Sequence, residues 1–134
     1  MRQSLSSKYS ESNISVIFCG DFNSTPPFGV VEYFTCGHIG AGHSDWSSQE
    51  GEQVEGLELN HQPIFTSAAG FPKYTNYTLG FKDCLDYIWL EKAKFEVTQV
   101  VPFPSEEELA LYSALPNIVF PSDHIALVVD VKLL

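Results

Sequence analysis

The stretch that most constrains the fold is an apolar run that ends abruptly in polar residues, Val16-Ile17-Phe18-Cys19-Gly20-Asp21-Phe22-Asn23-Ser24-Thr25-Pro26. Its first four residues predict a buried strand that is covered on both faces. Thr25 predicts the cap of a following helix, with Pro26 or Pro27 in the first turn. Because side chains alternate along a strand, Asp21 and Asn23 are expected to point to the same side. A carboxylate and an amide at that strand end can hold a metal ion, a water or a phosphate oxygen.

The composition is that of one folded domain, or part of one. The chain has 134 residues, of which 44% are hydrophobic and 18% are charged, so it has enough apolar material for a packed core. No apolar run has transmembrane length, and the first fifteen residues contain no apolar signal region. We therefore expect no membrane partner.

The net charge and the cysteines restrict the possible substrates and the compartment. The formal charge is −10, with 17 acidic against 7 basic residues, which excludes a bulk electrostatic grip on nucleic acid. A polyanionic substrate then needs a divalent cation to screen it. Cys19, Cys36 and Cys84 cannot all pair, and they are predicted to be reduced core residues of an intracellular protein.

The remaining pattern predicts a mixed chain in which strands outnumber helices. A polar lead-in over 1–14 precedes the first strand, and the Gly- and Ser-rich stretch 38–56 predicts a surface loop. Ser105 and Glu108 form a capping-box pattern. The predicted strands cover 15–20, 74–78, 84–90, 94–101 and 125–131, and the predicted helices cover 29–36, with Gly37 as the stop, and 105 to about 115.

Asp86 is the most informative single residue, because it lies inside the apolar strand 84–90. Burying an unpaired carboxylate there costs on the order of several kcal/mol, so Asp86 needs a partner. His124 is the expected partner, since a carboxylate fixes the tautomer of an imidazole and raises its basicity. The alternatives are an exposed position for Asp86 and a turn or cap role for Asp123, the neighbour of His124.

Two other polar groups have simpler interpretations. His38, His43 and Asp45 do not have the spacing of a common zinc site. The acidic run 106–108 is interpreted as the first turn of a helix.

Three short motifs occur in a characteristic order: Gly20-Asp21-Phe22-Asn23, Leu85-Asp86-Tyr87 and Ser122-Asp123-His124. Together they resemble the last three signature motifs of the endonuclease/exonuclease/phosphatase superfamily. Tyr74-Thr75-Asn76-Tyr77-Thr78 and Cys84-Leu85-Asp86-Tyr87-Ile88 are similar to the branch of 2′,5′-phosphodiesterases and poly(A)-specific deadenylases. The resemblance implies an α/β (α+β) fold, a four-layer α-β-β-α sandwich, of which 1–134 form mainly the carboxyl-terminal half as a single domain.

The resemblance also implies an activity and a metal. The implied reaction is metal-assisted attack of water on the phosphate of oligoadenylate or poly(A), with 2′,5′ or 3′,5′ linkages, by a 3′-to-5′ exoribonuclease. The implied cofactor is Mg²⁺, with Mn²⁺ as an alternative. Asp21 would orient the attacking water, Asn23 would hold that water or the phosphate, and both would lie with Asp123 at the metal.

The remaining implied roles concern the substrate. His124 would contact the scissile phosphate, and Asp86 would orient the imidazole. Phe81 would stack on an adenine base, a contact that is typically worth about 1–3 kcal/mol, and Asn76 would also bind the substrate.

The chain is shorter than the catalytic domain of this family. It also lacks two features of that domain, an early asparagine motif and a glutamate that binds Mg²⁺. We expect an exposed apolar patch that is covered by the missing amino-terminal half or by self-association. The resemblance implies the mitochondrial matrix, with the cytoplasm as the alternative. Two alternative functions stay open: a non-catalytic fragment or interaction module, and another phosphatase or endonuclease of the superfamily.

Overall fold

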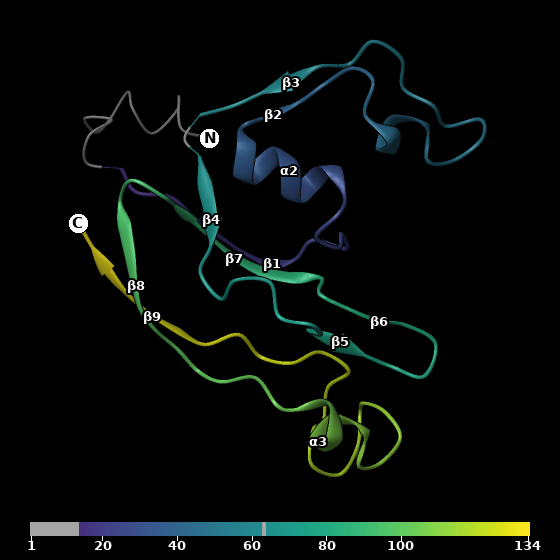
Figure 1. The fold of residues 1–134 in the computed structure, drawn as a ribbon, viewed down its shortest axis with the longest axis vertical. Helices are drawn as coiled ribbons and strands as arrows, with labels where there is room; N and C mark the ends of the chain where they lie inside the picture. The colour runs from purple at the N-terminus through teal and green to yellow at the C-terminus, as the bar shows by residue number, and fades with distance from the viewer. Residues whose placement is uncertain (1–13, 63) are drawn as a thin grey trace.

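A three-stranded antiparallel sheet in the order β1-β7-β4 forms the centre of the chain (Figure 1). The structure, a computed structural model, describes residues 14–62 and 64–134, so most of the predicted polar lead-in lies outside the described residues. The strands are β1 (Ile17–Asp21), β7 (Asp86–Glu91) and β4 (Phe65–Ser67). In the β1–β7 register Ile17 lies opposite Leu90 and Asp21 lies opposite Asp86. The polar ends of the two strands therefore meet.

Helix α2 (Gly29–Cys36) covers one face of this sheet, as Figure 1 shows. Val31 and Phe34 pack in a cluster with Phe65 of β4 and Trp89 of β7. The rings of Phe34 and Trp89 are stacked with a centroid distance of 5.2 Å. The helix ends at Gly37, whose φ of 75° is left-handed. The predicted helix and its glycine stop are confirmed.

The start of α2 differs from the prediction. Thr25 does not cap the helix and the prolines do not enter it, because the N-cap is Phe28 and no side chain of the cap residue forms a hydrogen bond. Instead the Asp45 carboxylate accepts a hydrogen bond of 2.7 Å from the Gly29 N–H. A Cβ at Gly29 would lie 2.4 Å from Ile39 Cδ1, so a larger residue there would force the end of the Ile39 side chain to move. The cap comes from a distant segment, which the local pattern could not show.

The predicted surface loop over 38–56 is partly wrong. Strand β2 (His38–Ile39) pairs with β3 (Leu59–Asn60), and a short 3₁₀ helix, η2 (Ser44–Ser47), lies between them. Ile39 is buried at 4% exposure. This segment is anchored because it supplies the cap and a packing contact for α2.

A second cluster lies below the central sheet in Figure 1. The hairpin of β5 (Asn76–Tyr77) and β6 (Lys82–Asp83) meets α3 (Glu106–Ala110) there. The cluster is made of Tyr77, Leu109, Ala114, Leu115 and Ile125. The strand predicted over 74–78 is thus shortened to the two residues of β5.

Helix α3 has the predicted start but not the predicted end. Ser105 Oγ accepts from the Glu108 N–H, and the Glu108 carboxylate accepts from the Ser105 N–H, so the capping box is confirmed. The helix ends at Ala110, about five residues before the expected end. Ser113, which donates its N–H to the Ala110 carbonyl, has a φ of 74° that turns the chain out of the helix.

The last structural unit is the antiparallel pair of β8 (Phe95–Val100) and β9 (Val129–Leu133), with a register shift between Val97 and Gln99. Strand β9 begins four residues later than predicted. The residue predicted to start it, Ile125, instead donates its N–H to the Thr75 carbonyl at 2.7 Å. That segment is therefore tied to the site hairpin before it reaches β9.

Strand β1 was predicted to be buried on both faces, and this is wrong. All five of its residues are exposed, with Ile17 at 47% and Phe18 at 41%. Only the side that carries Phe18 packs on α2 and β4, where its ring contacts Phe34 and Phe65. Cys19 and Cys36 are exposed as well, so Cys84 alone meets the prediction of a core cysteine. Ile17 and Cys19, on the other side of β1, are exposed among the described residues.

We predict that Val31→Ala lowers the free energy of unfolding by about 2 kcal/mol, because Val31 is 5% exposed in the first cluster. The matched control is Val30→Ala in the same helix, where Val30 is 37% exposed and the expected loss is below about 0.5 kcal/mol. Urea unfolding measures both values. Equal losses would contradict the packing described for α2.

Candidate active site

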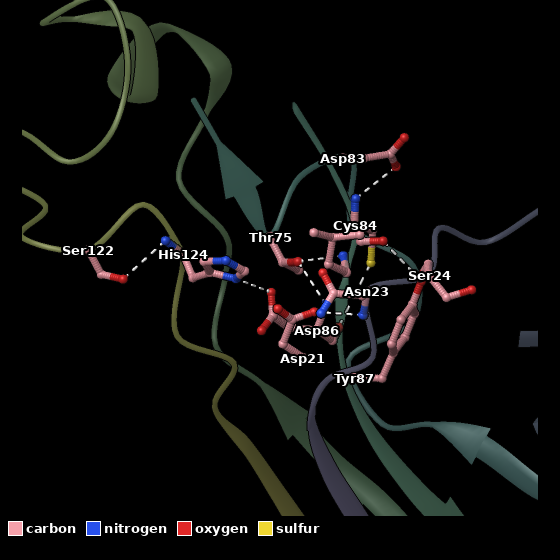
Figure 2. A network of polar contacts seen from close by, with 11 residues as sticks. Asp21, Asn23, Ser24, Thr75, Asp83, Cys84, Asp86, Tyr87, Ser122 and His124 are labelled. Atoms are coloured by element: carbon pink, nitrogen blue, oxygen red, sulfur yellow. Dashed lines mark hydrogen bonds and ion pairs between the residues drawn. The ribbon is translucent and has the colours of Figure 1, made fainter. Parts of the chain in front are cut away.

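The site is centred on a hydrogen bond between His124 and Asp86, whose Nδ1 and Oδ2 atoms lie 2.8 Å apart (Figure 2). Asp86 is the first residue of β7, and its side chain is 15% exposed; the side chain of His124 is 29% exposed. The expected pairing of a carboxylate in an apolar strand with this imidazole is confirmed. With Nδ1 held by Asp86, the other ring nitrogen, Nε2, is left for a ligand.

Thr75 positions the Asp86 end of this pair. Its fully buried Oγ1 accepts hydrogen bonds from the N–H groups of Leu85 and Asp86, at 2.8 and 3.0 Å. This role of Thr75 was not predicted. A hydroxyl in a strand-like run gives no signal by itself, because its donors lie ten and eleven residues further along the chain.

The next two residues position the His124 end. Asn76 forms an isolated antiparallel bridge with His124. The Tyr77 N–H donates to the Asp123 carbonyl at 3.1 Å, and Ser122 Oγ accepts from the His124 N–H at the same distance. The Ser122-Asp123-His124 motif is therefore held against β5 by backbone bonds.

Asp21 and Asn23 lie on the other side of Asp86, where β1 ends. Asp21 is the register partner of Asp86. Asn23 has a φ of 48°, and its N–H donates to Asp21 Oδ1 at 2.7 Å. The strand alternation expected for Asp21 and Asn23 does not reach Asn23, because β1 ends at Asp21 and the chain turns there.

The acidic surroundings raise the pKa of His124. The largest cause is its hydrogen bond to Asp86, and the charges of Asp86, Asp123 and Asp21 act in the same direction, while burial opposes them. The predicted site residues Asp21, Asp86, Asp123 and His124 therefore lie in one electrostatic environment. The negative charges of Asp21, Asp86 and Asp123 favour the imidazolium form of His124, whose positive charge attracts an anion.

A cleft of about 450 Å³ opens at this pair. Its polar end contains Asp86, Ser122 and His124, and its apolar end is lined by side chains of β1, β7 and the segment after His124, namely Cys19, Ile88, Ile125, Ala126 and Leu127. An anion bound at the polar end would lie beside the imidazole of His124.

The two further residues implied to bind substrate have different surroundings. Asn76 is 6% exposed, and its side-chain amide forms no hydrogen bond with another described residue. Phe81 is 46% exposed beyond the end of β5, in the turn where its N–H donates to Thr78 Oγ1. Asn76 is thus adjacent to His124, whereas Phe81 lies at the other end of the hairpin.

The chemistry of the donors fits Mg²⁺, but their number does not make a complete site. Asp21, Asn23 and Asp123, the implied metal ligands, offer the oxygen atoms that Mg²⁺ prefers. Within residues 14–62 and 64–134, however, no three His, Cys, Asp or Glu side chains are grouped so that they could hold a metal. His43 and Asp45 make other contacts: Asp45 Oδ2 accepts a hydrogen bond from the Gly29 N–H, and His43 Nδ1 accepts one from the Asp45 N–H.

The fold and the site define a member of the Endonuclease/Exonuclease/phosphatase family, to which the chain belongs: residues 5–124 match that family. The fold of this chain is similar to that of the human Nocturnin catalytic domain, with a TM-score of 0.52 and 23% sequence identity. That match covers 99% of this chain and 38% of the Nocturnin chain.

Named relatives give a finer comparison. The chain is 50% identical over 119 residues to the 2′,5′-phosphodiesterase 12 of Homo sapiens and to that of Rattus norvegicus. It is 34% identical over 122 residues to the CCR4-Not complex 3′-5′-exoribonuclease subunit Ccr4 of Schizosaccharomyces pombe. About 89% of this chain is covered in each case, but only 20% of the phosphodiesterases and 18% of Ccr4. The chain thus spans about a fifth of the length of these relatives.

The described residues contain no helix that is long and apolar enough to cross a membrane.

We predict that Asp86→Asn lowers the pKa of His124 in metal-free buffer, because the hydrogen bond to Asp86 is the largest cause of its raised value. NMR titration of the His124 ring measures the change. The matched control is Asp83→Asn: Asp83 caps the Cys84 N–H and is absent from the causes that act on His124.

The stability consequence has a defined sign. The pKa of His124 in the folded state is raised above its ordinary value, so the stabilisation from the pair is fully present below the unfolded pKa and is lost as the pH rises through the folded pKa. The difference in unfolding free energy between the parent and Asp86→Asn should therefore shrink as the pH rises. A difference that grows over that window would contradict the assignment.

Proposed function

We propose that this chain is the carboxyl-terminal part of a divalent-cation-dependent phosphodiesterase that hydrolyses oligoadenylate or poly(A). The observation that carries the proposal is the Asp86–His124 pair at the polar end of a cleft, with Asp21 and Asp123 in the same environment. Similarity to a 2′,5′-phosphodiesterase and to a 3′-5′ exoribonuclease supports the reaction class and both linkages.

His124 is assigned to the scissile phosphate. Asp86 accepts a hydrogen bond from the Nδ1–H group of His124. The Nε2–H group of the imidazolium can then donate a hydrogen bond to a non-bridging oxygen. Negative charge grows on those oxygens as water attacks, and a fixed donor there stabilises the transition state. Asp86 acts through His124 and is a positioning residue.

Asp21 and Asn23 are assigned to the attacking water. The Asp21 carboxylate orients the water and accepts its proton, while the Asn23 amide holds the water or a phosphate oxygen. Asp21 and Asp86 lie directly opposite each other in the β1–β7 register. Like charges in that arrangement repel, which favours a bound cation near them.

Mg²⁺ is the cation proposed, with Mn²⁺ as the alternative. When bound, it would neutralise the phosphate oxygens of the substrate. Asp21, Asn23 and Asp123 would contribute part of its ligands. No group of three His, Cys, Asp or Glu side chains lies together among the described residues, so water and the phosphate of the substrate would supply further ligands.

Asn76 and Phe81 are assigned to the nucleotide. The Asn76 amide lies beside His124 and forms no side-chain hydrogen bond with another described residue, so it can read a base or sugar hydroxyl. Phe81 is exposed and can stack on adenine, since every base offers an aromatic face. An enzyme of the mitochondrial matrix or of the cytoplasm would fit this substrate.

A second candidate is a fragment that keeps the fold without turnover. The incomplete set of metal ligands favours it for the isolated chain. The two candidates differ in whether the longest native form of the protein hydrolyses the substrate.

We predict that Asp21→Ala and His124→Ala each lower the hydrolysis of 2′,5′- and 3′,5′-linked tri-adenylate by at least about a hundredfold in the longest native form of the protein, which corresponds to roughly 2.7 kcal/mol of barrier. His38→Ala is the control, because His38 is exposed and pairs with Glu58 outside the cleft. Losses well below a hundredfold in both variants would remove the assigned roles.

We predict that the isolated chain binds Mg²⁺ only weakly and hydrolyses little or no tri-adenylate, because its ligand set is incomplete. Isothermal titration calorimetry measures the affinity. Micromolar binding by the isolated chain would show that the site is complete without further residues.

A further inference from the structure

One lysine close to the candidate active site has no acidic partner among the described residues. Lys82, the first residue of β6, is exposed, and its ammonium group lies 4.0 Å from the centre of the Tyr77 ring. No described carboxylate forms an ion pair with Lys82, whereas Lys73 pairs with Glu106. A lysine whose charge is not neutralised by a neighbour can bind an anionic ligand.

The ammonium group of Lys82 is held in place and stays charged. Tyr77 is 2% exposed and belongs to the second cluster, so its ring is a fixed surface that attracts a cation. Hydrogen bonding to the Tyr77 side chain raises the pKa of Lys82. The nearby carboxylate of Glu106 also acts in this direction, but it is bound by Lys73 and by the hydroxyl of Tyr74. Lys82 therefore presents a positive charge at a defined position.

The backbone fixes the distance between Lys82 and His124. Lys82 lies opposite Tyr77 in the β5–β6 register, and Tyr77 follows Asn76, which bridges to His124. Two steps between neighbouring strands therefore separate the backbones of Lys82 and His124, roughly 10 Å in all. The hydrogen bond from the Tyr77 N–H to the Asp123 carbonyl holds this arrangement.

The residue before Lys82 is Phe81, which is exposed and is assigned to an adenine base. The turn that carries Phe81 is fixed by Thr78, whose hydroxyl accepts from the Phe81 N–H and donates to the Phe81 carbonyl. Aromatic side chains that stack on bases, combined with cations that contact the backbone, are typical of sites for single-stranded nucleic acid. Phe81 and Lys82 together have this character.

We infer that Lys82 binds a phosphate of the substrate other than the scissile one, so that the protein favours an oligonucleotide with at least two phosphodiester bonds. This inference rests on the proposed function, which assigns the scissile phosphate to His124 and an adenine to Phe81. The formal charge of the chain is −10, so a local cation is needed to hold a second phosphate. A contact to phosphate carries no sequence information, so Lys82 selects the length of the substrate rather than its bases.

The first test compares di-adenylate with tri-adenylate, both without terminal phosphates, in the longest native form of the protein. Di-adenylate has a single phosphate and cannot occupy His124 and Lys82 at once, whereas tri-adenylate has two. We expect Lys82→Gln to lower kcat/KM for tri-adenylate by at least about fivefold, mainly through KM, and for di-adenylate by less than about twofold. Lys82→Arg should restore the parent values. Equal losses with the two substrates overturn the inference.

The matched control is Lys92→Gln, which removes the same charge from the chain. Lys92 is also exposed, but it follows β7 at the end away from Asp86, six residues later and therefore roughly 20 Å along the strand. This variant should change kcat/KM for either substrate by less than about twofold. Equal effects of Lys82→Gln and Lys92→Gln would assign the effect to the net charge and overturn the inference.

The second test measures binding without hydrolysis. Fluorescence anisotropy of a labelled, phosphorothioate-linked tri-adenylate gives the association constant at several salt concentrations. Each phosphate contact to a single strand adds about 0.7 to the slope of the logarithm of this constant against the logarithm of the salt concentration. Lys82→Gln should reduce the slope by about this amount, while Lys92→Gln should leave it unchanged. An unchanged slope in Lys82→Gln, or no binding by the parent, overturns the inference.

The outcomes separate this inference from the proposed function. A reduced salt slope in Lys82→Gln, in a protein that does not hydrolyse tri-adenylate with Mg²⁺, upholds the phosphate contact and refutes the phosphodiesterase. Hydrolysis of tri-adenylate at the parent rate and KM by Lys82→Gln upholds the phosphodiesterase and refutes the contact.

Discussion

The hydrogen bond between Asp86 and His124 joins the central sheet to the segment that follows α3, and the arrangement of the site depends on it. The two residues are 38 positions apart in the chain. Both side chains are partly buried, so their interaction is stronger than that of a surface ion pair. A carboxylate at the start of an apolar strand is tolerated because the imidazole satisfies it, and the imidazole is oriented because the carboxylate holds one of its nitrogens.

Three successive residues make that bond possible. Thr75 fixes the backbone of Asp86 through its buried hydroxyl, Asn76 bridges to His124, and Tyr77 fixes the Asp123 carbonyl while its ring fills the second cluster. Packing and site geometry are thus coupled at one short strand. A change in the Tyr77 cluster would displace the Asp123–His124 segment as well as lower stability.

The parts that sequence analysis predicted well are those with local or energetic signals. The pairing of Asp86 follows from the cost of burying a lone carboxylate, and the left-handed Gly37 and the Ser105 capping box follow from local backbone rules. The resemblance of the three motifs predicted the family, which the comparisons confirm.

The parts that it missed depend on contacts between distant segments. The cap of α2 comes from Asp45, sixteen residues after Gly29, so no local pattern shows it. The hydroxyl of Thr75 acquires its role only from the turn that brings Asp86 back to it. The apolar residues of β1 correctly indicate a strand, but all five residues of the strand are exposed in the described part of the chain.

The most direct measurement is a crystal structure of the longest native form of the protein with Mg²⁺ and a phosphorothioate-linked tri-adenylate. The account predicts that a non-bridging phosphate oxygen lies within hydrogen-bond distance of His124 Nε2 while Nδ1 keeps its bond to Asp86. A phosphate bound away from His124, with the Asp21 carboxylate facing solvent, would contradict it.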